Sequence, residues 1–583
     1  MIYRFSILLI FIFLLVTFSS NSQENIDVKG VVYDSLNQEV IPFVSIYRES
    51  DKKGTLSDFE GQFLLEDLNK EDMLIFSYIG FERRAIHVGS WQKDTIFMLP
   101  KAQLTEEVFV LADNSFLYDM VRSVSKNEQT FNGVAKTYLE LESFGPDQQL
   151  ELYQGYYNGT YTGYDIEDLQ MKNARFSVSP ISKRIFASTE ISKAIYLHKL
   201  IDKNAYFPGN PFELRNRKMR KAYDLKLNKR FKDDNGHTIY VITCEPRDPN
   251  GELFTTKAWI DSTESRLQKI NLTIENAKQH PFLPLWPNHT IDDVGLSITK
   301  SFQLINGSSI TKTVDFDYHL AYVNERGEQL PIRSRAVLSA YEYSDFFFLP
   351  LFNFTRVSSN DFRRIQMLPD NSKFWECNDD FQMRNTSDQR KAFLEDYRTI
   401  NSQKLLNTKE ILGDLFFEAP YVSWSKNRVL IDGISKDSSD YYTRQNVYRV
   451  FRYDFDIQFY VDRNELCDSV QLITKAIYDP YTSFYHFYAE KENQVFLNIL
   501  FDLMEIERRK LHKELMQCGD DEDCIRAKYL NAKKTANELK EQYFLDVERG
   551  TEREELKKWN AVVFEELKID NIKIFDLQPK EQK

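Results

Sequence analysis

Short apolar runs separated by turn residues dominate the first part of the chain. Residues 27–34 and 41–47 each predict a strand that ends at a turn. Residues 54–63 predict a strand, a tight turn with glycine and a second strand, and residues 74–82 predict a buried strand. This spacing of short strands predicts an all-β sandwich over residues 23–110.

The middle of the chain follows a two-residue hydrophobic period after one predicted helix at 114–125. The clearest example is 314–320, where Val314, Phe316, Tyr318 and Leu320 share one face. Further strands are predicted at 137–142, 239–243, 258–261 and 267–272. We therefore expect an antiparallel, β-rich middle domain over residues 111–404.

The pattern changes near residue 419. Strands are predicted at 448–451 and 455–461, and helices at 491–516, 524–543 and 552–567. In the first helix the apolar residues recur at helical spacing, at Phe496, Ile499, Leu500, Leu503 and Ile506. We expect an α+β domain over residues 405–583, which makes the fold class multidomain and mainly β, with a helical C-terminal part.

The N-terminal residues have the pattern of a targeting segment. Arg4 lies in a short n-region, residues 5–18 are apolar, and residues 19–22 are small, which together predict a secretory signal peptide over residues 1–22. The alternative is a membrane anchor, but the apolar run is shorter than the roughly 20 residues that a span needs. Because the first cysteine is Cys244, lipid attachment at a cysteine near the cleavage site is excluded. We expect an exported mature chain without a transmembrane span, in the periplasm, at the outer membrane or secreted.

Composition narrows the class of protein. The 583 residues carry 88 Asp and Glu against 75 Lys and Arg, a net charge of −13, which argues against nucleic acid as a partner. Apolar residues make up 42% and aromatic residues 14%, which fits a folded, strand-rich chain. The chain has only 20 glycines and five cysteines, and these low counts exclude collagen-like and disulfide-dense scaffolds.

Four ordered motifs in the first domain resemble the carboxypeptidase-regulatory-like domain. They are Val28-x-Gly30-x-Val32-x-Asp34, Pro42-Phe43-x-x-Ile46, Gly54-Thr55-x-x-Asp58-x-x-Gly61-x-Phe63 and Ser77-Tyr78-Ile79-Gly80-Phe81. The resemblance implies a transthyretin-like accessory domain without zinc, of the kind that opens many exported Bacteroidota proteins, including outer-membrane receptors. Asp58 has two interpretations, a calcium ligand or a turn-stabilising residue, and its place beside a tight turn favours the second.

A second, looser resemblance concerns the middle domain. The Trp259-Ile260-Asp261 strand, a turn and the Leu267-x-Lys269-Ile270 strand are similar to the curved half-barrels of lipoprotein-carrier proteins. Such a sheet can curl around a hydrophobic ligand or lipid. The aromatic stretch 345–354 either lines such a cavity or is a packed core segment, and we favour the core segment.

One strand of the middle domain also brings metal-ligand residue types together. Asp315, Asp317 and His319 share the polar face of their strand, but no second histidine lies nearby in sequence. A single histidine beside an aspartate is usually a surface hydrogen-bonding pair. We therefore expect no metal site at these residues.

The C-terminal part resembles a family of bacterial zinc proteases. The matching residues are Ala476-Ile477-Tyr478-Asp479-Pro480, Phe501-Asp502-Leu503-x-Glu505-x-x-Arg508-Arg509-Lys510-Leu511 and Trp559. In that family a His-Glu-x-x-His pair, which binds zinc and supplies a general base, precedes the Phe-Asp segment. Here residues 496–500 are Phe-Leu-Asn-Ile-Leu, and Arg549 stands where the family has a further histidine. The resemblance implies a degenerate metalloprotease-like domain, and the alternative is an unrelated helical domain.

The cysteines and remaining histidines add one candidate feature. Cys518 and Cys524 flank a predicted turn and are a candidate disulfide in an oxidising compartment. The acidic residues between them lack the spacing of a calcium loop, so a solvated turn is the favoured interpretation. Spacing leaves the pairing of Cys244, Cys377 and Cys467 open, and His486 and His512 lie too far apart in sequence to rebuild a site.

The sequence thus favours an exported cell-envelope protein with a noncatalytic binding or structural role. We expect no catalytic residue, cofactor or metal, and an unknown protein or envelope component as the partner. Two alternatives stay open: a hydrolase whose site forms from residues distant in sequence, and a carrier of a hydrophobic ligand in the middle domain.

Overall fold

The computed structural model describes most of the chain, in stretches that leave gaps. The described residues are 26–50, 54–92, 94–102, 114–127, 132–178, 198–284, 287–343, 345–352, 364–365, 371–378, 421–431, 453–467, 469–485 and 490–577. The predicted signal peptide, the strand predicted at 448–451, His486 and the boundary predicted between residues 404 and 405 lie outside them. Within these stretches no helix combines the length and the apolar character that crossing a membrane requires.

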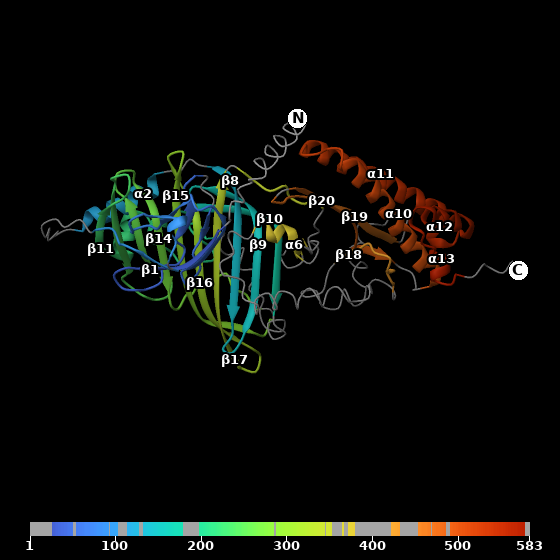
Figure 1. Ribbon diagram of the computed structural model, residues 1–583. Coiled ribbons are helices and arrows are strands. Elements are labelled where there is room, and N and C mark those ends of the chain that lie inside the picture. Colours follow the sequence, from blue (N-terminus) through green and yellow to red (C-terminus); the bar gives the residue numbers. More distant parts are fainter. Residues whose placement is uncertain are drawn as a thin grey trace, which may run out of the picture. The chain divides into compact units, whose positions relative to one another are not determined.

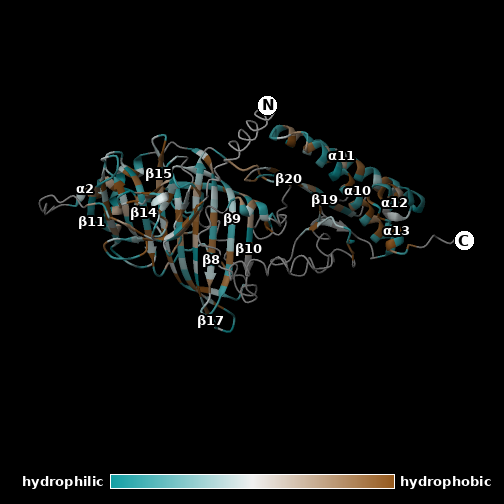
Figure 2. Cartoon of the chain, viewed as in Figure 1, coloured by the Kyte–Doolittle hydropathy of each residue, from teal (hydrophilic) through white to brown (hydrophobic). Residues whose placement is uncertain are grey.

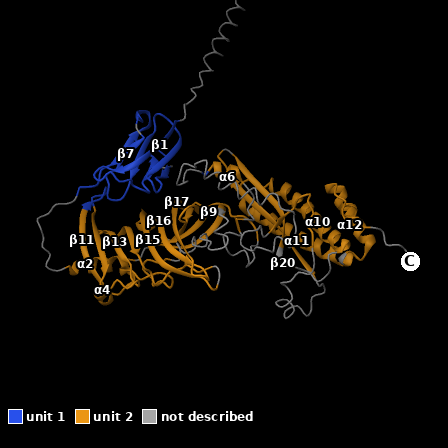
Figure 3. Cartoon of the chain, turned by 90° about the horizontal axis from the view of Figure 1, so that it is seen from below, with its two compact units in different colours: residues 1–106, 231–236, 378–387 blue, residues 107–230, 237–377, 388–583 orange. Residues whose placement is uncertain are grey.

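The chain divides into two compact units, coloured separately in Figure 3. The first contains residues 1–106, 231–236 and 378–387, and the second contains the rest. Together the two units are mainly β, with helices concentrated in the C-terminal part (Figure 1). The predicted fold class is confirmed at this level.

The first unit is a sandwich of two small sheets. One has the order β4-β1-β7 and the other the order β3-β2-β5-β6. β1 pairs antiparallel with β4 and parallel with β7. Alternate residues of these strands, among them Val28, Val32, Ile46, Phe63 and Phe76, form one buried core. The strands are β1 (Ile26–Asp34), β2 (Ser45–Arg48), β3 (Gly54–Leu56), β4 (Gln62–Leu68), β5 (Met73–Ser77), β6 (Arg84–His87) and β7 (Thr95–Met98), with a short η1 (Val88–Ser90).

Asp58 organises the turn that leads into β4. Its Oδ1 accepts hydrogen bonds from the backbone N–H groups of Glu60 at 2.9 Å and Gln62 at 2.7 Å. Gly61 follows with a φ of 73°, a left-handed conformation that favours glycine. These bonds fit the interpretation of Asp58 as a turn-stabilising residue.

A ten-stranded sheet forms the larger part of the second unit. Its order is β10-β9-β8-β17-β16-β15-β14-β13-β12-β11, so the sheet is open, with β10 and β11 at its edges. The predicted antiparallel, β-rich middle is therefore correct. The elements are α2 (Ser115–Lys126), β8 (Asn132–Phe144), β9 (Gln149–Thr162), β10 (Asp165–Val178), η4 (Pro211–Glu213), α4 (Asn216–Ala222), β11 (Tyr223–Lys232), β12 (Thr238–Pro246), β13 (Thr255–Asp261), β14 (Arg266–Ile274), β15 (Thr290–Ile305), β16 (Ser308–Val323) and β17 (Gln329–Tyr343).

The two-residue period of these strands places one set of side chains in a large core. In β16 the predicted face, Val314, Phe316, Tyr318 and Leu320, is buried. The same core takes in α2 and many tyrosines and phenylalanines from β9 and the connecting segments. Figure 2 shows the resulting alternation of hydrophobic and hydrophilic residues along the strands.

In the described residues, the C-terminal part combines a three-stranded sheet with the helices α10 to α13. The sheet order is β18-β20-β19, and α10 packs against β19 and β20 while α11, α12 and α13 contact α10. The three helices predicted from sequence are confirmed. The elements are α6 (Ser372–Glu376), β18 (Val422–Ser423), β19 (Tyr453–Glu465), β20 (Val470–Tyr485), α10 (Lys491–Leu515), α11 (Glu522–Val547), η6 (Glu548–Gly550), α12 (Arg553–Leu567) and α13 (Asn571–Ile574).

Candidate functional site

Helix α10 contains residues 496–500, which match the zinc-binding turn of the protease family that the C-terminal part resembles. Phe496, Leu497, Ile499 and Leu500 are each 0% exposed, and all four belong to the core of the C-terminal part. The ring of Phe496 stacks on Tyr543 of α11, with centroids 5.2 Å apart, and packs edge-on against Tyr453 of β19. The turn therefore lies in a filled core.

Asn498, the one polar residue of that turn, binds backbone. Its Oδ1 accepts from the N–H of Val429 at 2.9 Å, and its Nδ2 donates to the carbonyl of Val429 at 2.8 Å. One turn earlier, Gln494 makes the same pair of bonds with the N–H and carbonyl of Ile431. The two side-chain amides thus bind the backbone of the segment at Val429 and Ile431 as a neighbouring strand would, and they make none of these bonds to its side chains.

Asp502 holds the same segment through its side chains. The carboxylate is fully buried, and its oxygens accept from Arg428 Nη1 at 2.8 and 2.9 Å. Trp424 Nε1 donates to it at 2.7 Å, and Asn571 Nδ2 of α13 donates at 2.7 Å. A carboxylate with all its partners inside the protein is a structural anchor. The Phe501-Asp502 match to the protease family thus falls on a residue with a packing role here.

The other end of the protease resemblance contributes packing as well. Trp559 of α12 lies edge-on to Tyr543, with centroids 5.7 Å apart, and its Nε1 donates to Asp546 at 3.3 Å. The side chain of Arg549 lies outside the described residues. His512 contacts Thr474 of β20, with 3.1 Å between Nδ1 and Oγ1.

Asp315, Asp317 and His319 occupy the face of β16 predicted from sequence. Burial, and then the neighbouring Asp317, raise the pKa of Asp315 to about 7, and Lys269 and Arg335 oppose this shift. Burial also raises the pKa of Asp317, against the charges of Arg333 and Arg335. His319 is exposed, with Nε2 3.9 Å from Glu275 Oε2. The two aspartates are thus flanked by cationic side chains, which disfavours a metal cation between them.

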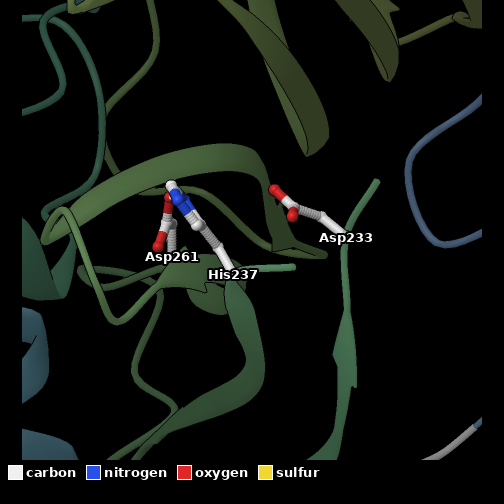
Figure 4. Close-up of side chains that lie close together, drawn as sticks. All are labelled: Asp233, His237 and Asp261. Atoms are coloured by element: carbon white, nitrogen blue, oxygen red, sulfur yellow. The ribbon is translucent and has the colours of Figure 1, made fainter. Parts of the chain in front are cut away.

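A histidine and an aspartate to which sequence reasoning gave no joint role meet where β12 begins and β13 ends (Figure 4). His237 Nδ1 lies 2.9 Å from Asp261 Oδ2, to which Arg266 also donates at 3.1 Å. The other oxygen of Asp261 accepts from the backbone N–H of Thr263 at 2.9 Å. Asp233, also labelled in Figure 4, belongs to the first unit. The second unit by itself supplies one imidazole and one already bonded carboxylate, which is too few ligands for a metal site.

The aromatic stretch after β17 packs between parts of the second unit. Phe347 contacts the ring of Tyr156 on β9, whereas Phe348 joins the core of the C-terminal part. Phe352 packs against Tyr421 and Tyr460. Phe348 and Phe352 are thus buried in cores, whereas Phe346 is 55% exposed, so the core interpretation holds for part of the stretch. Residues 353–354 lie outside the described part.

A buried ion pair joins the sheet edge to the C-terminal part. Lys172 of β10 is 1% exposed, and its Nζ donates to Asp462 Oδ1 at 2.5 Å and to the carbonyls of Phe348 at 2.7 Å and Arg463 at 2.8 Å. Burial lowers the pKa of Lys172 and raises that of Asp462, and each partner opposes the shift of the other. No sequence spacing links these two residues, so sequence reasoning missed the pair.

The structure contains two disulfides. One joins Cys518 and Cys524, the candidate pair, with Cα atoms 5.7 Å apart. The other joins Cys377 and Cys467, which are separated by 90 residues and have Cα atoms 5.3 Å apart. Cys244 is buried in the sheet core, and burial raises the pKa of its thiol to about 12.

Comparison with known proteins identifies the first domain. Residues 28–110 match the family model of the CarboxypepD_reg-like domain, as the motifs predicted. Two TonB-dependent receptors of Formosa agariphila, P3 and P39, are each 28% identical, over 106 and 101 residues that make up 18% and 17% of this chain. The matches cover 10% of each receptor, so this chain spans a tenth of the length of these relatives. None of these similarities supports the resemblance to zinc proteases.

Three solved structures show weak likeness to the chain. An outer membrane lipoprotein-sorting protein domain from Vibrio parahaemolyticus is 12% identical, with a TM-score of 0.17, over 39% of this chain and 90% of that one. A LolA superfamily protein from Nitrosomonas europaea is 10% identical, with a TM-score of 0.15, over 39% and 91%. The Pseudomonas aeruginosa MucA/MucB complex is 12% identical, with a TM-score of 0.13, over 38% of this chain and 93% of that one. TM-scores this low carry no argument about function. What the comparisons establish for this chain is therefore a carboxypeptidase-regulatory-like domain at residues 28–110.

Proposed function

We propose that this chain is an exported protein of the cell envelope whose C-terminal part has a noncatalytic binding or structural role. The observation that carries the proposal is the complete burial of the turn from Phe496 to Leu500. Every position that would hold the two zinc ligands and the base is occupied by an apolar side chain inside the core. A zinc ion with an open coordination position for substrate needs polar ligands and access to solvent, neither of which this turn provides.

The placement in the envelope rests on the first domain and the cysteines. Residues 28–110 match the CarboxypepD_reg-like domain, and parts of two TonB-dependent receptors resemble this chain, which supports an envelope location. The predicted signal peptide over residues 1–22 supports export. Disulfides persist in oxidising compartments outside the cytosol, so pairing of four of the five cysteines fits the same location.

The proposal is tested on the full chain expressed in a bacterium of the Bacteroidota type. Fractionation should recover the protein with the envelope or the medium, and the purified protein should contain no stoichiometric zinc and leave unfolded casein intact. Recovery in the cytosol contradicts the proposed location. Stoichiometric zinc together with casein cleavage that a chelator abolishes contradicts the noncatalytic role.

A further inference from the structure

A solvent-open cavity of about 400 Å³ lies beside the C-terminal half of α10 and the end of α12. Its size falls within the range of small-molecule sites. Ile506 and Leu567 supply buried apolar wall, while the polar lining is mostly cationic. The charged and ring side chains around it are Arg508, Arg509, Lys510, His512, Lys513 and Glu566.

Two arginines at the cavity share one carboxylate. Glu505 is buried, and its Oε1 accepts from Arg508 Nη2 at 2.7 Å and from Arg509 Nε at 2.9 Å. Its Oε2 accepts from Arg508 Nε at 3.0 Å. One negative charge thus faces two guanidinium groups. The guanidinium carbon of Arg509 also lies over the ring of Trp424, 5.5 Å from its centroid, which is within the range of a cation–π contact.

The two lysines differ in their partners. Lys510 pairs with Glu507 on the same helix, with 2.7 Å between Nζ and Oε1. Lys513 is exposed, and among the residues that the structure describes no carboxylate forms an ion pair with it. Glu566 is the one acidic side chain of the lining. Counting the paired acids, four cations face three carboxylates in a chain whose net charge is −13.

His512 adds an uncharged ring to the cavity lining. Arg508 Nη1 donates to Thr474 Oγ1 at 2.8 Å, and the same hydroxyl lies 3.1 Å from His512 Nδ1. Burial and the charge of Arg508 lower the pKa of His512, so the ring is neutral at pH 7.

We propose that this cavity binds a phosphate group carried by a small molecule or by a lipid headgroup. Arg509 and Lys513 supply the uncompensated charge, and Ile506 and Leu567 contact the less polar remainder of the ligand. A guanidinium and an ammonium group together match the charge and the several oxygens of a phosphate. The inference is independent of the proposed location and of the noncatalytic role.

The full-length purified chain is titrated against inorganic phosphate, and binding is read from broadening of the ³¹P signal. We expect Lys513→Gln and Arg509→Gln each to weaken binding at least fivefold. Glu566→Gln removes the opposing charge and should tighten binding at least twofold, which loss of folding cannot mimic. Lys534→Gln on α11 is the matched control, because its side chain is 76% exposed and lies away from the cavity lining.

The source of the phosphate is separated by flotation with phosphatidylcholine vesicles that do or do not contain phosphatidylglycerol. Flotation that needs phosphatidylglycerol and is lost in Lys513→Gln assigns a lipid headgroup, whereas phosphate binding without flotation assigns a soluble phosphorylated molecule. The proposal is overturned if the wild-type chain binds neither probe. It is equally overturned if Lys513→Gln and Glu566→Gln behave like Lys534→Gln.

Discussion

At the scale of single residues, Asp315 is a carboxylate placed where its charge is poorly tolerated. Its Oδ1 has no hydrogen-bond partner among the described residues, and burial raises its pKa from 3.8 to about 7. The folded protein therefore binds a proton at Asp315 more tightly than the unfolded chain does. The stability that this group contributes is present at acidic pH and is lost as the pH rises toward 7.

Asp315→Asn should remove this pH dependence, because the amide carries no charge in either state. We expect the variant to gain on the order of 1–3 kcal/mol relative to wild type at pH 8 and to gain little at pH 4. Urea denaturation at both pH values measures the difference. Asp202→Asn, at an exposed position in the same unit, controls for the loss of a charge. An equal gain in stability at both pH values would show that burial does not raise the pKa of Asp315.

At the scale of elements, helix α10 shows what a sequence pattern can predict. The 3.6-residue spacing of Phe496, Leu503 and Ile506 is sufficient to place the helix, because one apolar stripe must face a core. The same spacing does not predict the hydrogen bonds of Gln494 and Asn498, whose partners lie in the segment around Val429 and Ile431. Two amides four residues apart inside an apolar stretch were the available signal, and it indicates a buried polar contact without naming the partner.

The disulfide between Cys377 and Cys467 ties α6 to the turn between β19 and β20. Cross-linking two residues 90 positions apart removes more freedom from the unfolded chain than cross-linking residues 6 apart. We expect Cys377→Ser to cost about 2–4 kcal/mol, and Cys518→Ser about 2 kcal/mol less than that.

Peptide mapping without reductant identifies the pairs, and denaturation under oxidising conditions measures the two costs. Cys244→Ser is not a suitable control because that thiol is buried in the sheet core. Wild type with added reductant provides the reference for both variants. Free thiols at Cys377 and Cys467, or equal costs for the two variants, would contradict the pairing or its entropic origin.

At the scale of the whole molecule, Lys172 connects elements that sequence analysis assigns to different domains. Sequence alone indicates a β-rich middle and an α+β end, since the pattern of predicted strands and helices changes near residue 419. It cannot indicate that a lysine of β10 and Asp462 of β19 meet, because 290 residues separate them and neither lies in a motif. Sequence analysis missed the cavity beside α10 for a related reason. In the sequence, Arg508, Arg509 and Lys510 look like the solvent-exposed face of a helix, and only the fold shows that α12 lies beside them.

Replacing Lys172 tests this connection. Lys172→Met leaves the Asp462 carboxylate buried without its cation, and we expect a loss of about 3–5 kcal/mol. The double variant Lys172→Met/Asp462→Leu removes both charges and should recover most of that loss. Thermal unfolding of the three proteins at pH 7 supplies the comparison. A double variant that is no more stable than the single one would show that the ion pair itself holds the parts together.

The central claim, that α10 presents a filled core where a protease would hold zinc, is tested most directly by the unfolding free energy of Phe496→Ala. The matched control is Phe564→Ala on α12, whose side chain is 51% exposed. We predict that Phe496→Ala loses about 3–5 kcal/mol in urea denaturation and that Phe564→Ala loses less than about 1 kcal/mol. Equal, small losses for the two variants would mean that Phe496 faces an open cleft, and would contradict the account.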